Sequence, residues 1–97
     1  MKVRFTEQAE SDLARLADHI AESSPQRAVS FIGELRESGV SIADFPESHP
    51  LVGRYEEWGI RRKVHGNYLI FFKIGKDGID IIHILHGAMD YDAILFP

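Results

Sequence analysis

The stretch WGIRRKVHGNYLIFFKIGKDGIDIIHIL, Trp58 to Leu85, decides the fold. It contains three runs rich in β-branched and aromatic residues, a composition typical of strands. The runs are Trp58 to Val64, Tyr68 to Ile74 and Ile79 to Leu85. Gly66-Asn67 and Lys76-Asp-Gly78 separate them, and both are turn sequences. In the middle run the side chains of both strand faces are apolar, as in a central strand that is covered on both faces. The stretch therefore predicts a three-stranded antiparallel meander.

The residues before the meander show helical periodicity. Thr6 can cap one helix, and Ser24-Pro25 is the start signal of a second. In both segments apolar residues recur at spacings of three and four, which predicts two amphipathic helices. Their expected apolar faces are Ala9, Leu13, Leu16, Ala17 and Ile20, then Ala28, Ile32, Leu35, Gly39 and Ile42, widened by Val29, Phe31 and Phe45. Helices joined by so short a turn should pack as an antiparallel hairpin.

The two ends of the chain complete the predicted architecture. Val3 to Phe5 is a candidate edge strand, and Pro46 should end the second helix near Phe45 and open a loop to Gly53. The tail, Asp90 to Pro97, is expected to form one helical turn or an extended arm that docks on the sheet or contacts a partner. The predicted fold class is α+β in the order β-α-α-β-β-β. An N-terminal strand and a two-helix hairpin pack on a mainly antiparallel sheet with a C-terminal meander, and residues 1–97 form a single domain.

Composition excludes several kinds of function. The chain has 97 residues, a net charge of −4 and no cysteine. The absence of cysteine excludes disulfides, thiolate zinc sites and a cysteine nucleophile. The acidic excess argues against direct DNA binding, which needs a basic surface. The opening MKVRFTEQAESD has no apolar signal-peptide region and no apolar run could span a bilayer, so we expect a cytoplasmic protein with no direct membrane contact.

His83 and His86 raise the question of a metal site. On a helix this spacing would bring both rings to one ion, but on a regular strand an odd offset sends them to opposite faces. His83 would then share a face with Ile79, Ile81 and Leu85, and His86 would share the other face with Ile82 and Ile84. We therefore expect no metal site and no cofactor. Either histidine could still act in acid–base chemistry or simply hydrogen-bond to the backbone. His83 lies mid-strand among isoleucines, where a polar side chain needs a specific reason.

Arg61, Arg62 and Lys63 form the densest basic cluster of the chain. Strand alternation places Arg61 and Lys63 on one face and Arg62 on the other. One interpretation is a charged edge strand that resists aggregation. The other is a grip for phosphate or carboxylate on an open face of the sheet. The spacing alone leaves both interpretations open.

Three segments together resemble a known family. FTEQAESDLARLADHIAESSPQRAVSFIGEL resembles the two-helix opening of the RelE/ParE superfamily of bacterial toxins. FPESHPLVGRYEEWGIRRKVHGNYLIFFKI is similar to the loop and the two strands that follow in that superfamily. IIHILHGAMDY is similar to the ending of its ParE-like branch. The family has an arginine at the positions of His83 and Met89, and this chain departs from it there.

The resemblance implies the toxin half of a type II toxin–antitoxin system. A small cognate ParD-like antitoxin would neutralise it in a hetero-oligomer, and DNA gyrase would be the target of a non-enzymatic poison without catalytic residues. The alternative is a RelE-like endonuclease that cuts ribosome-bound mRNA. The two substituted arginines weaken that alternative, because RNA cleavage needs cations for the phosphate. Candidate toxicity or target contacts are Arg61, Arg62, Lys63, His83 and Tyr91. Candidate partner contacts are Phe31, Trp58, Ile94, Leu95 and Phe96.

Overall fold

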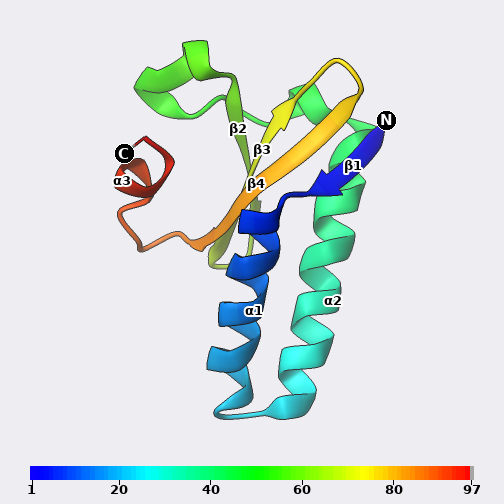
Figure 1. Cartoon of the computed structure of the whole chain (residues 1–97), viewed down its shortest axis with the longest axis vertical. Coiled ribbons are helices and arrows are strands. Elements are labelled where there is room, and N and C mark those ends of the chain that lie inside the picture. The colour runs from blue at the N-terminus through cyan, green and yellow to red at the C-terminus, as the bar shows by residue number, and fades with distance from the viewer. Residues whose placement is uncertain (97) are drawn as a thin grey trace.

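A single mixed sheet organises the chain, with strand order β1-β4-β3-β2. The computed structural model describes residues 1–96, with the side chains of all of them except Arg54 and Tyr55. β1 pairs in parallel with β4, and β4-β3-β2 form the predicted antiparallel meander. The elements are β1 Lys2–Phe5, α1 Glu7–Ala21, α2 Pro25–Ser41, β2 Ile60–His65, β3 Tyr68–Ile74, β4 Gly78–His86 and α3 Tyr91–Leu95. The predicted α+β fold and its element order are confirmed (Figure 1).

Both long helices begin where their capping signals lie. The Thr6 side chain accepts a hydrogen bond from the Ala9 N–H at 3.2 Å, and the Ser24 side chain accepts one from the Arg27 N–H at 3.2 Å. Each bond satisfies a backbone donor that the first helical turn cannot pair internally. The helices then run side by side as the predicted hairpin (Figure 1). An ion pair between Arg36 and Glu10 links them, and its hydrogen bond lowers the pKa of the Glu10 carboxyl.

The sheet has an apolar cluster on each face. The helix-side cluster packs α1 and α2 against the sheet, and the tail-side cluster packs α3 and the segment before β2 against the opposite face. The helix-side cluster is Ala9, Leu13, Leu35, Ile42, Ile70, Phe72, Ile79, Ile81 and Ile84. The tail-side cluster is Val52, Ile60, Phe71, Leu85 and Leu95. β3 contributes to both, which explains why its sequence is apolar at both parities.

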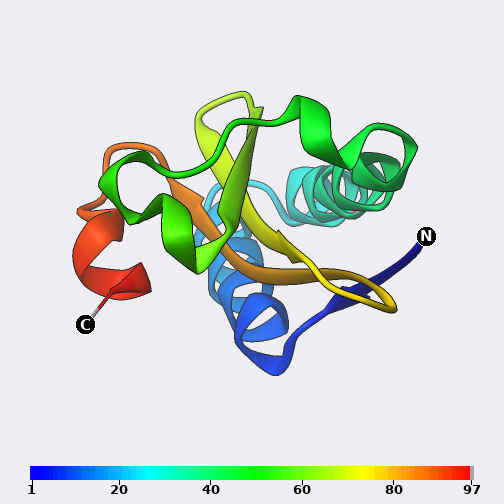
Figure 2. The same cartoon turned by 90° about the horizontal axis from the view of Figure 1, so that it is seen from above.

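The tail forms one helical turn and not an extended arm, and it docks on the sheet, which was one of its two predicted roles. Leu95 is buried in the tail-side cluster, and Tyr91, Ile94 and Phe96 pack around it. The tail therefore covers part of the sheet face opposite the two helices, so this face is not as open as one interpretation of the basic cluster required. In Figures 1 and 2 α3 and the 3₁₀ segment Gly53–Trp58 lie side by side, and β1 and α3 lie on opposite sides of the molecule. Pro97 lies outside the described residues.

Three other local predictions need correction. Val29 is 78% exposed, because it lies about 100° around the helix from Ala28 and outside the buried stripe. Phe45 is 74% exposed, because α2 ends at Ser41 and short 3₁₀ segments, Ile42–Asp44 and Pro46–Ser48, replace its last turn. Trp58 ends the 3₁₀ segment and does not begin β2, since Gly59 takes a left-handed conformation with φ of 70°.

None of the helices within residues 1–96 combines the length and the apolar character needed to cross a membrane.

His49 predicts a pH dependence of stability. Its ring packs edge-on against Phe72 with 5.8 Å between ring centroids. Burial, together with the charges of Lys63 and Arg61, lowers the pKa of His49 below its ordinary value of 6.5. The unfolded chain therefore binds a proton more readily than the folded chain, and the free energy of unfolding should fall as the pH drops below about 6.5. Urea unfolding at pH 7 and pH 5 measures this loss. It should be smaller in His49→Gln, and an equal loss in both proteins would refute the assignment.

Candidate functional site at the edge of strand β4

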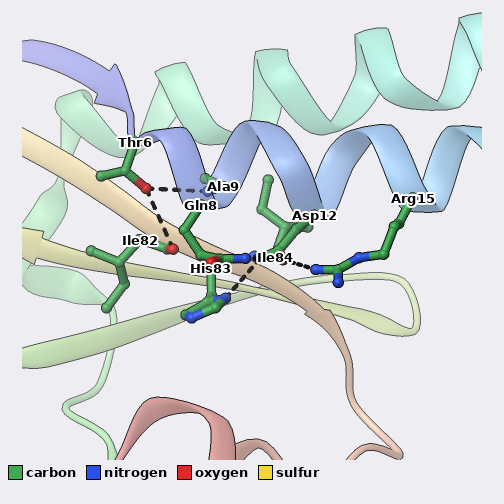
Figure 3. A network of polar contacts seen from close by, with 8 residues as sticks. All are labelled: Thr6, Gln8, Ala9, Asp12, Arg15, Ile82, His83 and Ile84. Atoms are coloured by element: carbon green, nitrogen blue, oxygen red, sulfur yellow. Dashed lines mark hydrogen bonds and ion pairs between the residues drawn. The ribbon is translucent and has the colours of Figure 1, made fainter.

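The outer edge of β4 is paired by two different parts of the chain. β1 pairs with it only from Gly78 to Ile81. Beyond that point the start of α1 supplies the partners. The Thr6 N–H donates to the Ile81 carbonyl at 3.0 Å, and the Thr6 hydroxyl donates to the Ile82 carbonyl at 3.4 Å (Figure 3). Thr6, the N-cap of α1, therefore continues the edge pairing that β1 begins, through its backbone N–H and its hydroxyl.

A β-bulge in β4 changes the predicted alternation of side chains. Phe71 pairs with His83 while its neighbour Phe72 pairs with Ile81, so Ile82 is the extra residue. Ile81 and Ile84 consequently pack on the helix side, whereas Ile82 and Leu85 pack on the tail side. The prediction that Leu85 shares a face with Ile81, and Ile82 with Ile84, is wrong because it assumed a regular strand.

Asp12 is the centre of a polar network at this edge. Its side chain is 2% exposed and accepts four hydrogen bonds. Oδ1 accepts from Gln8 Nε2 at 3.0 Å and Arg15 Nη2 at 2.8 Å, and Oδ2 from His83 Nδ1 at 2.8 Å and the Ile84 N–H at 2.9 Å. No buried side-chain nitrogen or oxygen among the described residues lacks a partner. The network supplies the reason for a histidine among isoleucines.

Sequence reasoning missed Asp12, although a signal was present. Asp12 lies three residues after Ala9 and four before Leu16, so helical periodicity places it on the apolar face of α1. A carboxylate on a buried face requires hydrogen-bond donors, and a polar residue of the packed sheet is the natural source.

The two histidines have fixed and different hydrogen-bonding states. His83 Nδ1 donates to the Asp12 carboxylate, which leaves Nε2 pointing away from α1 (Figure 3). His86 Nδ1 accepts a hydrogen bond from the Ala88 N–H at 3.0 Å, so Nε2 of that ring carries its proton. Both rings line one cavity of about 750 Å³ between α1 and the end of β4. No group of three metal-ligating side chains converges within residues 1–96.

The basic cluster of β2 contacts the chain itself. Arg61 Nη1 donates to the Glu47 and His49 carbonyls at 3.2 and 2.7 Å. Lys63 Nζ donates to the Ser38 carbonyl at 3.0 Å and the Ser41 hydroxyl at 2.7 Å. On the other face Arg62 Nη1 donates to the Tyr91 hydroxyl at 3.1 Å. The predicted alternation is confirmed, and each side chain fixes a neighbouring segment.

Lys63 should stabilise the end of α2. Its ammonium lies at the C-terminus of the helix, where the helix dipole favours a positive charge. We expect Lys63→Met, which keeps the apolar part of the side chain, to lower the free energy of unfolding by about 1 kcal/mol. Lys76→Met in the β3–β4 turn is the control and should change stability little. Equal effects in urea unfolding would contradict the capping role.

The structure does not bring His83 together with Arg61 and Lys63. β3 lies between β4 and β2, which separates their backbones by roughly 9–10 Å. Arg61 and Lys63 pair with the helix-side residues Phe72 and Ile70, whereas His83 pairs with the tail-side Phe71. These three side chains therefore form no common site.

The predicted partner contacts lie on two separate surfaces. Phe31 of α2 is half-buried beside Tyr68, with 5.3 Å between ring centroids, and the Arg27 guanidinium lies 5.0 Å above its ring. Trp58 is 46% exposed and packs edge-on against Phe96 at 4.7 Å. The remaining two, Ile94 and Leu95, belong to α3, and Leu95 is buried.

Comparisons with known proteins identify the family. The model of the ParE toxin of the type II toxin–antitoxin system parDE matches residues 3–91. A chain from the chromosomal ParDE system of P. aeruginosa has a TM-score of 0.75 and 18% identity, covering 89% of this chain and 95% of that chain. A chain from the RelBE2 toxin–antitoxin complex of Mycobacterium tuberculosis has a TM-score of 0.63 and 21% identity, covering 88% and 95%. No curated protein matches. The structural likenesses establish the fold, and the family match spans most of the sequence. The chain belongs to the ParE toxin family of type II toxin–antitoxin systems.

Proposed function

We propose that the chain is a toxin that inhibits DNA gyrase without cleaving nucleic acid. A ParD-like antitoxin neutralises it in the cytoplasm by forming a hetero-oligomer. The observation that carries this proposal is the ParE family match over residues 3–91. Gyrase is the target that the ParE-like branch implies.

The arrangement of charged side chains supports a non-enzymatic mechanism. Cleavage of RNA through its 2′-oxygen needs a base, an acid and cations around one phosphate. Arg61 and Lys63 donate to backbone carbonyls of their own chain. They lie on the helix side of the sheet, whereas His83 pairs with Phe71, whose side chain is on the tail side. Met89 stands where the family has an arginine, which removes a further cation. The cations at the positions that the resemblance singles out, Arg61 and Lys63, therefore do not converge with His83 on one phosphate.

One observation favours the RelE-like endonuclease as a second candidate. His83 donates through Nδ1 to a buried carboxylate, and a histidine oriented in this way is suited to transfer protons at Nε2. An mRNA endonuclease would use this pair as its acid–base group. Arg62 and Tyr91 are hydrogen-bonded to each other and contact or pair with Phe71, as His83 does, so they would be the predicted toxicity residues on the same sheet face.

The contact surfaces are also part of the proposal. We assign antitoxin contact to Phe31 and Trp58, whose aromatic rings are partly exposed. Ile94 and Phe96 extend the Trp58 surface. Leu95 is 8% exposed, so it would reach a partner only if α3 moved off the sheet.

Mapping of mRNA 5′ ends after induced expression separates the two candidates. The gyrase proposal predicts growth arrest without codon-positioned cuts, relieved by co-expression of the product of the adjacent small gene. His83→Ala is the matched variant, because it removes the acid–base group and leaves the Ile84 N–H as a donor to the same Asp12 oxygen. Cuts that appear with the unmodified chain and disappear with His83→Ala would overturn the non-enzymatic proposal. Growth unaffected by expression would overturn both candidates.

A further inference from the structure

The cavity between α1 and the end of β4 has an unusual balance of polar groups. Its described polar lining consists of Gln8, Asp12, Arg15, His19, Tyr68, His83 and His86. Asp12 is the only acid among the lining residues that the structure describes, and its two oxygens already accept four hydrogen bonds. The carboxylate therefore has little remaining capacity for another donor.

The hydrogen-bond donors of the same cavity are not used up. Arg15 is 70% exposed and has five N–H donors, of which one contacts Asp12. His86 presents the Nε2 proton, because its Nδ1 is occupied by the Ala88 N–H. The Tyr68 hydroxyl donates to no other described residue, and its ring packs against His86 at 5.2 Å. His19 Nδ1 lies 3.9 Å from a carboxylate oxygen of Glu22, so His19 is not counted among the available donors of the cavity.

His83 is a further lining group of the cavity. Its Nδ1–H is held by the Asp12 carboxylate, which leaves Nε2 as the ring nitrogen available to a ligand. Apolar side chains, Leu16, Met89 and Ile94, complete the wall. The cavity volume of about 750 Å³ is within the range of small-ligand sites.

We propose that this cavity binds an oxyanion, a carboxylate or a phosphate, through Arg15 and His86, with His83 in the cavity wall. The body that carries the oxyanion lies against Leu16, Met89 and Ile94. The ligand is a small anionic metabolite or an acidic group of a bound protein, and both present the same chemistry to the cavity. This inference does not depend on gyrase as the target, because the site belongs to the chain alone.

NMR of the ¹⁵N-histidine-labelled chain tests the site directly. The probes are inorganic phosphate, acetate and butyrate, with sodium chloride at equal ionic strength as the reference. We expect saturable shifts at His83 Nε2 and His86 Nε2, with a Kd for phosphate on the order of 1 mM. Butyrate should bind up to about tenfold more tightly than acetate, because it adds two methylene groups to the apolar contact. Tighter binding of phosphate than of butyrate would indicate a phosphorylated ligand, and the reverse order a carboxylate.

Arg15→Gln and Arg27→Gln form the matched pair. Both arginines lie on exposed helix surfaces and each contacts a carboxylate, but only Arg15 lines the cavity. Arg15→Gln should weaken anion binding about tenfold or more, since it removes a charge-assisted hydrogen bond, and Arg27→Gln should leave it unchanged. The unaltered shifts of His49 serve as an internal check. Equal shifts with sodium chloride, no saturation up to about 50 mM phosphate, or equal affinity of the two variants would overturn the proposal.

Discussion

Replacing Asp12 by alanine is expected to lower the free energy of unfolding by about 3 kcal/mol. The carboxylate is buried and joins α1 to the edge of β4 through four hydrogen bonds. Without it the Ile84 N–H and the His83 ring lose their acceptor in a place that water reaches poorly. A buried donor without a partner costs about 1–3 kcal/mol, and the helix-to-sheet link is lost as well.

Urea unfolding measures this loss, and two variants act as controls. Asp18→Ala removes an exposed acid from the same helix and should change stability by about 0.5 kcal/mol or less. Asp12→Asn keeps one acceptor oxygen and should lie between Asp12→Ala and the unmodified chain. A loss below about 1 kcal/mol for Asp12→Ala would mean that the network contributes little to the fold.

Gly78→Ala is expected to destabilise the chain by about 2–3 kcal/mol. Gly78 has a φ of 156°, and a Cβ atom there would collide with the carbonyl oxygen of Lys2, its partner on β1. The obstacle is backbone, so no side-chain rotation relieves it. β1 would have to move away from β4, and the edge that α1 continues would lose its first part.

Gly33→Ala is the control for this glycine. Gly33 lies in the exposed part of α2, and its added Cβ would meet nothing within 4 Å. Since alanine is the better helix former, this variant should gain about 0.5–1 kcal/mol. Thermal unfolding of both variants measures the contrast. A Gly78→Ala protein as stable as the unmodified chain would show that β1 tolerates displacement from β4.

The predictable parts of the fold are those that local chemistry determines. Thr6 and Ser24-Pro25 start their helices because a side-chain cap acts within one turn. Tyr68 to Ile74 was predicted with the bounds that the structure gives, since the flanking turns limit the strand on both sides. Apolar side chains on both faces of this strand likewise predicted that other elements would pack against both of its faces.

The errors at the candidate site arise where distant parts of the chain meet. The β-bulge at Ile82 arises because β4 pairs with β3 on one side and with Thr6 on the other, and no local sequence motif predicts it. The Asp12–His83 pair joins residues 71 positions apart. The sequence contained both halves of the pair, a polar residue on each apolar surface, but only the tertiary fold brings them together. Likewise, the roles of Arg61 and Lys63 as donors to loop and helix carbonyls depend on where those segments fold.

The most direct test of the central claim is a DNA supercoiling assay with purified gyrase and increasing amounts of the purified chain. The proposal predicts that supercoiling is inhibited as the chain is added, and that an equimolar amount of the cognate antitoxin restores it. His83→Ala should inhibit supercoiling even if it no longer binds anions in the cavity, because no acid–base step is required. Full supercoiling at every concentration of the folded chain would contradict the claim that this toxin acts on gyrase.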